Sequence, residues 1–304
     1  MPRALLIVNP KATATNPRIR DIIIRALASD LKLDVAETER RNHAIDLARE
    51  AVQSGEIELA VALGGDGTVN EVVNGLAGST IPLAVVPGGS TNVFARALGL
   101  SPSPVEATSE ILDALRAGRR RTINLGRAND RLFTFCAGLG IDAEVVRAVE
   151  RHRRKGRSAS PALYVRSAIR HYYTGTNRTD AHITLTRPGA DPVSGLFNAI
   201  VANGSPWTYL GQRAVDPCPH ADFDGHLDAL LMRKLSTVST LRVVRQMLDG
   251  RPRMRTRIGL QLHDIAEFTL TADTPLAAQV DGDYIGELDQ VTYTSVPNAL
   301  TVIV

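Results

Sequence analysis

Apolar and polar positions follow two alternating patterns in the first third of the chain. Short apolar runs, at residues 4–8, 59–63 and 82–86, end at Asn, Gly or Pro and predict buried strands. The segments around them, such as residues 17–31 and 43–54, place apolar positions at helical spacing. The other elements predicted here are a strand over residues 33–38 and helices over residues 69–76, 91–98 and 105–117. Strands that alternate with helices are typical of a parallel sheet with helices on both faces.

From about residue 122 the pattern changes to closely spaced strands separated by turn residues. Two helical stretches, residues 141–173 and 236–249, interrupt them. The predicted strands cover residues 122–128, 131–137, 180–187, 195–202, 227–232, 256–261, 265–272, 276–281, 290–295 and 299–304. We therefore predict an α/β domain over residues 1–122 and a mostly antiparallel β-sandwich over residues 123–304. Whether the last strand returns to the first domain is left open.

The length of the chain agrees with two domains, and its composition indicates where the protein works. The chain has 304 residues, enough for two domains at roughly 150 residues each. Cys136 and Cys218 have no CxxC spacing, which predicts buried free thiols in a reducing cytoplasm. The chain shows neither a signal peptide nor an apolar run of roughly 18 residues, so we expect any membrane contact to be peripheral. A pI near 9.0 weakly indicates an anionic partner.

Two glycine-rich turns follow predicted strands and open predicted helices. The first is Gly64-Gly65-Asp66-Gly67-Thr68 and the second runs from Pro87 to Asn92. Glycines let backbone N–H groups approach a phosphate, and Asp66 beside a phosphate requires a cation such as Mg²⁺. The chain lacks both the GxGxxG and the GxxxxGK[ST] patterns. The alternative is a tight turn in which Asp66 or Thr68 caps a helix.

These turns carry a resemblance to a known family. The run from Gly64 to Leu76 (GGDGTVNEVVNGL) resembles the signature of the diacylglycerol kinase catalytic-domain family, and Pro87 to Arg96 (PGGSTNVFAR) resembles its second signature. The family includes bacterial lipid kinases, sphingosine kinases and ceramide kinases. The shorter GGDGT core is shared with NAD kinases and, more loosely, with phosphofructokinases. The resemblance implies an NAD-kinase-like nucleotide domain that uses ATP and Mg²⁺.

The resemblance also implies particular nucleotide contacts. They are Asn9, Pro10, Lys11, Ala12, Thr13, Thr38, Gly65, Asp66, Gly67, Thr68, Val69, Asn70, Glu71, Ser90 and Asp283. Asp66 is expected to take part in catalysis by organising Mg²⁺. This chain has Ala12-Thr13 where the family often has Ser-Gly, Val93 where it often has Asp, and Asp283 where it has Glu.

Two acidic segments in the second half complete the expected site. Asp222-Phe223-Asp224-Gly225-His226-Leu227-Asp228 resembles a segment that holds a structural Mg²⁺, here through Asp224 and the main chain of Ala221 and His226. The alternative is an ordinary Asp-Gly turn. The resemblance makes Asp281 the base that receives the acceptor's hydroxyl proton. Without the resemblance, Asp281-Gly282 is typical of a hairpin turn.

Residues 147–170 form a basic stretch with interleaved apolar positions and a single acid, Glu150. Such a helix suits an anionic membrane surface, and the alternative is a solvated charged helix. We expect no nucleic-acid partner, because the stretch has no helix-turn-helix, zinc-finger or RNA-recognition signature.

Together these features predict a transferase of phospholipid biosynthesis. It would move the γ-phosphoryl group of MgATP onto a lipid hydroxyl, with diacylglycerol as the favoured acceptor. The alternatives are a sphingoid-base or other lipid kinase, then an NAD kinase, then a binding module without chemistry. We expect a cytoplasmic protein with its lipid substrate at an anionic membrane, and a homodimer stays open.

Overall fold

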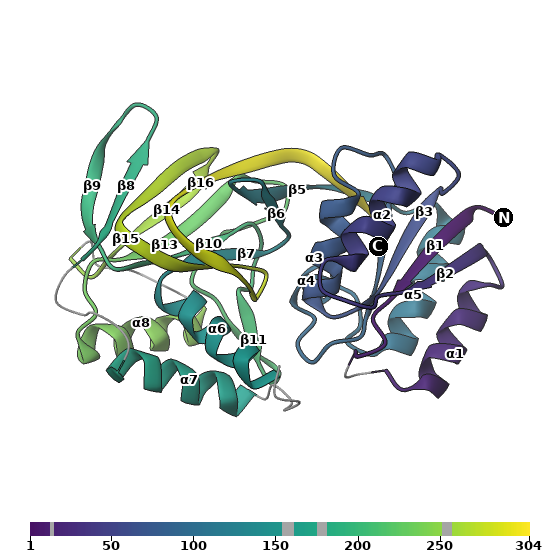
Figure 1. Cartoon of the computed structure of the whole chain (residues 1–304), viewed down its shortest axis with the longest axis horizontal. Coiled ribbons are helices and arrows are strands. Elements are labelled where there is room, and N and C mark those ends of the chain that lie inside the picture. Colours follow the sequence, from purple (N-terminus) through teal and green to yellow (C-terminus); the bar gives the residue numbers. More distant parts are fainter. Residues whose placement is uncertain (13–14, 154–160, 175–180, 251–256) are drawn as a thin grey trace. The chain divides into compact units, whose positions relative to one another are not determined.

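The computed structural model describes residues 1–12, 15–153, 161–174, 181–250 and 257–304. It divides into two compact units, which are described one at a time (Figure 1). The first unit comprises Met1–Leu125 and Pro297–Val304, and the second comprises Gly126–Val296. Two strands belong to both: β5 (Arg121–Ala128) leads out of the first unit and β16 (Asp283–Val302) leads back into it.

The first unit is built on a parallel sheet. Its strands β1 (Arg3–Val8), β2 (Lys32–Glu37), β3 (Leu59–Gly64) and β4 (Leu83–Pro87) lie in the order β2-β1-β3-β4. The last residues of β16 add a further parallel strand, with Val302 beside Leu83. Every residue of β3 and β4 is buried, as expected for central strands covered on both faces.

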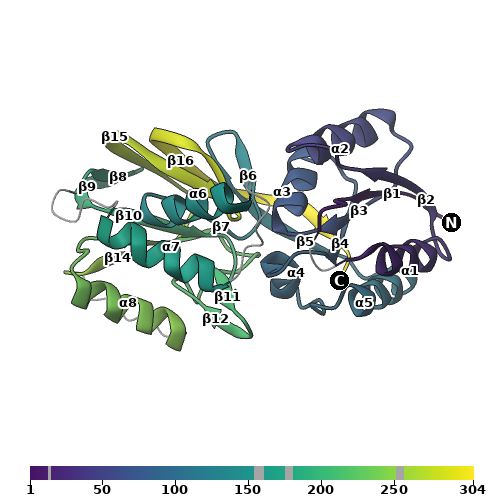
Figure 2. The same cartoon turned by 60° about the horizontal axis from the view of Figure 1, so that its bottom comes forward.

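Five helices cover this sheet: α1 (Pro17–Leu27), α2 (His43–Ser54), α3 (Asp66–Gly75), α4 (Val93–Ala97) and α5 (Pro104–Ala117). Figure 2 shows α1 and α5 on one face of the sheet and α2 on the other. Ile23 and Leu27 of α1 share a buried cluster with Ile111 of α5. Asn16 caps the start of α1 by accepting a hydrogen bond from the Ile19 amide, so the first helix begins where the sequence offers a cap.

The second unit is mostly antiparallel. Its strands are β6 (Arg131–Phe133), β7 (Cys136–Leu139), β8 (Ile183–Arg187), β9 (Ala190–Leu196), β10 (Asn198–Ala202), β11 (Thr208–Leu210), β12 (Arg213–Val215), β13 (Leu227–Met232), β14 (Gly259–Ile265) and β15 (Glu267–Val280), with the first part of β16. The main order is β14-β13-β10-β7-β15-β16, and β8 pairs with the first part of β15.

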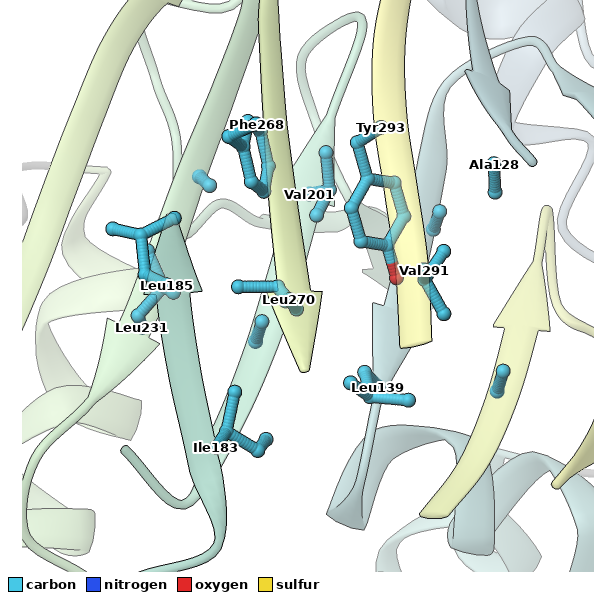
Figure 3. Close-up of a cluster of buried hydrophobic side chains, with 14 of the residues drawn as sticks. Ala128, Leu139, Ile183, Leu185, Val201, Leu231, Phe268, Leu270, Val291 and Tyr293 are labelled. Carbon is cyan, nitrogen blue, oxygen red and sulfur yellow. The ribbon is translucent and has the colours of Figure 1, made fainter. Parts of the chain in front are cut away.

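A large core fills the inside of this unit (Figure 3). Phe268 and Tyr293 from β15 and β16 stack with ring centroids 5.2 Å apart. Val201 and Leu231 reach the same core from β10 and β13. Burial in this core raises the pKa of the Tyr293 hydroxyl well above its usual range.

The other face of β10 and β13 packs against helices. Ile200 and Leu230, one residue away from the core positions, join a second buried cluster with Val243 and Met247 of α8 (Thr237–Asp249) and Tyr172 of α7 (Pro161–Thr174). Successive side chains of a strand point to opposite faces, so residues 199–202 and 229–232 are apolar on both faces. Helix α6 (Ile141–Arg153) also belongs to this unit.

The predicted fold class, an α/β domain followed by a mostly antiparallel β-sandwich, is confirmed. Cys136 and Cys218 are buried free thiols, also as predicted. Several elements were predicted wrongly. Residues 141–173 contain two helices rather than one, and β9, β11 and β12 were missed. Most of the two runs predicted at 265–272 and 276–281 lies in the single strand β15, whose exposed Asp273 to Pro275 interrupt the apolar pattern.

In the part of the chain that the structure describes, no helix has the length and apolar character needed to span a bilayer. Residues 154–160, the middle of the predicted basic stretch, lie outside the described residues.

Candidate active site

The two glycine turns of the first unit pack directly against each other. The Gly88 amide donates a hydrogen bond to the Gly64 carbonyl at 2.7 Å. A Cβ atom on Gly89 would lie 2.8 Å from the Gly65 Cα, and one on Gly88 would lie 3.1 Å from the Gly64 Cα. Both contacts are with backbone, which cannot rotate away, so the close approach of the turns depends on glycine. The turns meet because they follow the neighbouring strands β3 and β4.

Asp66 of the first turn is hydrogen-bonded to the helix that follows the second turn. Its two carboxylate oxygens accept hydrogen bonds from the Val93 and Phe94 amides, each at 3.1 Å. These are the first two amides of α4, so Asp66 caps a helix other than its own. The Asn92 side chain closes the turn by accepting from the Gly89 amide and donating to the Gly89 carbonyl.

The loop after β1 joins the same edge of the sheet. The Asn9 side-chain amide donates to Thr68 Oγ1 at 3.0 Å, and Asn9 Oδ1 accepts from the Lys11 amide at 3.0 Å. A Cβ on Gly88 would lie 3.2 Å from the Ala12 Cβ, so this loop also borders the second turn. Pro10, Lys11 and Ser90 are exposed, Ala12, Gly65 and Gly67 are half-buried, and Thr13 lies outside the described residues.

Four of the predicted nucleotide contacts, Thr68 and the three residues that follow it, are buried within the fold. Val69 and Asn70 lie on the buried side of α3, and Glu71 is also buried. The Glu71 carboxylate accepts from the Asn42 amide at 2.8 Å and the Ala44 amide at 3.1 Å, at the start of α2. Thr38 is half-buried at the carboxyl end of β2, and its amide donates to the Val8 carbonyl. The Glu71 side chain therefore links α3 to α2, and its contact with nucleotide stays a prediction.

Replacing Glu71 by alanine is expected to destabilise the protein by about 2 kcal/mol, because two backbone amides lose a charged acceptor in a buried place. Urea unfolding of wild type and variant measures this. Glu50→Ala is the matched control, since Glu50 is an exposed residue of α2. Unchanged stability together with a raised KM for ATP would show that Glu71 contacts the nucleotide instead.

In the second unit, Asp281 and Gly282 form the hairpin turn between β15 and β16, both with positive φ (47° and 79°). The Asp281 carboxylate is nevertheless buried. One oxygen accepts from the Thr134 amide (2.7 Å) and the Thr134 hydroxyl (2.9 Å), and the other accepts from the Phe135 (3.0 Å) and Cys136 (3.1 Å) amides. A carboxylate accepts about four hydrogen bonds, so a hydroxyl proton would reach Asp281 only after one of these partners gives way. Asp283, also a predicted contact, begins β16 and is half-buried.

A buried carboxylate that was not predicted supports this turn. Gln279 accepts a hydrogen bond from the Gly282 amide at 2.9 Å and donates one to Asp142 Oδ2 at 3.1 Å. The other oxygen of Asp142 is buried and has no hydrogen-bond partner. Burial raises the pKa of Asp142 to about 6, although the Gln279 hydrogen bond opposes the shift. Nothing in the local sequence distinguishes Asp142 from an ordinary first-turn acid.

This raised pKa predicts a pH-dependent stability. Because the folded-state pKa of Asp142 exceeds its unfolded value of 3.8, stability falls as pH rises between these values, by about 3 kcal/mol in total. Asp142→Asn removes that titration, so the variant should gain about 3 kcal/mol relative to wild type between about pH 4 and pH 7. Urea unfolding at both pH values measures it, with the exposed Asp289→Asn as control. Parallel pH profiles for wild type and Asp142→Asn would show that the shift is absent.

The predicted metal loop precedes β13 and forms a tight turn. The Gly225 amide donates to the Asp222 carbonyl at 3.1 Å and the Asp224 amide donates to Asp222 Oδ1 at 3.0 Å. The His226 amide donates to Asp264 Oδ1 at 2.9 Å. Ala221 is buried, whereas Asp224 is exposed.

This loop offers a cation few carboxylates. Asp222 is engaged with a loop amide, and Asp228 accepts from the His263 ring and the Asp264 amide. Among the described residues, no group of three His, Cys, Asp or Glu side chains is arranged to hold a metal. A carboxylate such as that of Asp224, together with main-chain oxygens, suits a hard cation that keeps several waters, as Mg²⁺ does.

Two family models match the chain. The "Diacylglycerol kinase catalytic domain" model matches residues 3–128, and the "YegS C-terminal NAD kinase beta sandwich-like domain" model matches residues 136–304.

Curated relatives and solved structures agree with these models. The protein named "Probable lipid kinase YegS-like" of Chromohalobacter salexigens is 31% identical over 251 residues, which is 80% of this chain and 74% of that protein. "Diacylglycerol kinase" of Bacillus subtilis is 39% identical over 149 residues, 46% of either chain. A crystal structure described as a diacylglycerol kinase of Bacillus anthracis has a TM-score of 0.76 at 22% identity, and the match covers 99% of this chain and 96% of that one. At 22% identity this structural match shows a shared fold and nothing more.

Proposed function

Because the chain belongs to the lipid kinase family that joins a diacylglycerol kinase catalytic domain to a YegS-type C-terminal domain, we propose that it phosphorylates diacylglycerol. The reaction transfers the γ-phosphoryl group of ATP to the free hydroxyl, giving phosphatidic acid and ADP. The observation that best supports a nucleotide site is the pair of glycine turns held together by Asp66. We assign the nucleotide to the first unit and the lipid to the second.

The first turn suits phosphate because its glycines place no side chain over the backbone amides at the start of α3. Anions are stabilised at helix N-termini, where amide donors and the helix dipole act together. Pro10, Lys11 and Ser90 are exposed at the same edge of the sheet and can meet the nucleotide from outside. Mg²⁺, when bound, neutralises the negative charge that develops on the transferred phosphoryl group.

The proposed base is Asp281. For this role the carboxylate exchanges one of its four hydrogen bonds for the lipid hydroxyl, and the Thr134 hydroxyl is the simplest partner to give way, because it can rotate. The backbone amides of Phe135 and Cys136 would hold the other oxygen in place. Asp224 is the proposed carboxylate ligand of a structural Mg²⁺, with main-chain oxygens of Ala221 and His226.

We also propose that the enzyme works at the cytoplasmic face of an anionic membrane. The described part of the basic stretch includes Arg147, Arg151 and Arg153 in α6 and Arg166 and Arg170 in α7. Arg147 is engaged with Glu287 at 2.7 Å and lies over the Tyr284 ring, so it belongs to the fold of the second unit. Arg166 and Arg170 are exposed.

Transfer of label from γ-labelled ATP tests the proposal. Purified protein with Mg²⁺ is given diacylglycerol in anionic mixed micelles, a sphingoid base in the same micelles, or NAD in buffer. Label in phosphatidic acid supports the proposed acceptor. Label in the sphingoid product would support a lipid kinase with a different acceptor. Label only in NADP would contradict a lipid acceptor.

A further inference from the structure

Helix α8 presents an apolar stripe to solvent. Val238, Leu241 and Val244 are 74%, 64% and 44% exposed, although valine and leucine are usually buried. The opposite side of the helix is buried through Val243 and Met247, which pack into the second cluster of the second unit. The exposed stripe is therefore not needed to attach α8 to the fold.

Arginine side chains border this stripe. Arg242 and Arg245 lie on the exposed side of α8, and Arg233 and Lys234 are exposed just before the helix. The only acid in α8 is Asp249, in its last turn, which pairs with Arg213 at 3.4 Å and with Arg245 at 3.8 Å. The exposed side thus combines aliphatic side chains with positive charge.

Helix α7 extends the same surface. Tyr172 shares the buried cluster with α8 residues, and its hydroxyl donates to the Leu235 carbonyl just before α8. Figure 2 shows α7 and α8 side by side along one side of the second unit. Ile169 and Tyr173, one helical turn apart, are each 56% exposed, and α7 contains no acidic residue.

We propose that this α7–α8 surface rests on an anionic lipid bilayer. Aliphatic side chains of an amphipathic helix enter the boundary between headgroups and acyl chains, while arginines keep their guanidinium groups at the lipid phosphates. The mixed pattern favours a bilayer, because a nucleic acid would leave Val238 and Leu241 without apolar surroundings. This inference deepens the proposed function, on which it rests, by naming the face that brings the enzyme to its substrate.

Vesicle binding by the full chain tests the surface. Co-sedimentation is measured with phosphatidylcholine vesicles that contain phosphatidylglycerol and with phosphatidylcholine alone. We expect wild type to bind the anionic vesicles more tightly. Val238→Ser/Leu241→Ser should weaken that binding at least tenfold. Arg242→Gln/Arg245→Gln should weaken it by about 30-fold, since each arginine near an anionic surface contributes roughly 1 kcal/mol.

The matched control is Ile22→Ser/Arg25→Gln on α1, where an exposed isoleucine (47%) and an exposed arginine lie on a helix of the first unit. This control should bind like wild type. Anionic vesicle binding that survives both α8 variants, or that the α1 variant loses to the same extent, would overturn the proposal. So would a wild-type dimer that Val238→Ser/Leu241→Ser converts to a monomer without a loss of vesicle binding.

Kinase assays distinguish a failure of the proposed membrane-binding surface from a failure of the proposed reaction. On a short-chain diacylglycerol dispersed as monomers, the α8 variants should keep wild-type rates, because Val238 and Leu241 lie far out in solvent and contribute little to folding. If vesicle binding follows the predicted pattern but no lipid is phosphorylated, the proposed reaction is contradicted and the proposed membrane-binding surface is supported.

Discussion

Asp66→Asn is expected to lower the rate of phosphoryl transfer by about 100-fold or more. The asparagine keeps one acceptor oxygen for the start of α4, but its amide nitrogen faces a second backbone donor. The start of α4 then loses one of the two hydrogen bonds that it donates to Asp66, and the site loses a negative charge beside the proposed Mg²⁺. Initial rates and the KM for ATP measure the effect, with the exposed Asp21→Asn as a charge-matched control.

Stability distinguishes the two contributions of Asp66. Loss of a helix cap costs about 1 kcal/mol, which leaves the protein folded at room temperature. A variant that is folded by circular dichroism and yet inactive therefore points to the geometry and charge of the phosphate site. A rate within a few-fold of wild type would contradict the assignment of the nucleotide to these turns.

The second large effect is expected for Asp281→Asn, which should destabilise the protein by about 3–5 kcal/mol. The asparagine amide must replace an oxygen that accepts two hydrogen bonds, so at least one buried backbone donor of residues 134–136 loses its partner. If Asp281 is also the base, the rate should fall by a further ~10²–10⁴-fold in variant protein that is still folded. Urea unfolding and initial rates at low temperature measure the two effects separately.

Thr134→Val provides the matched comparison for Asp281. It removes only the hydroxyl donor and leaves the carboxylate and the three backbone hydrogen bonds in place. We expect a loss of about 1 kcal/mol of stability and a rate close to that of wild type. Folded Asp281→Asn protein with near-normal activity would show that the carboxylate only holds the hairpin turn, and the proton would then need another acceptor.

Elements with a strong local pattern were predicted closely. The predicted bounds of α2 (His43–Ser54) and β13 (Leu227–Met232) are those of the structure, because helical spacing in one and an unbroken apolar run in the other leave little choice. Strand β9 was missed because it is mostly exposed and contains Pro192 and Gly195. The family resemblance, read from the two glycine turns, is confirmed by the family models and relatives.

The sequence named candidate site residues but not the contacts that hold them in place. The turns at Gly64 and Pro87 were both predicted, and they lie together because the parallel strands β3 and β4 end at the same edge of the sheet. That Asp66 caps α4 and that Glu71 caps α2 depends on contacts across 27 to 29 residues of sequence. The hydrogen-bond partner of Asp142 is Gln279, 137 residues away in sequence, and its raised pKa comes from burial that no local pattern predicts. The catalytic and nucleotide roles predicted for Asp66, and the nucleotide contact predicted for Glu71, stay predictions.

The path of β16 has a consequence for how the protein is made. Residues 297–304 complete the parallel sheet of the first unit, where Ile303 is buried and its amide donates to the Leu83 carbonyl. A ribosome synthesises these residues only after the whole second unit. The first unit, although most of its sequence comes earlier, therefore acquires this strand only after the entire second unit has been synthesised.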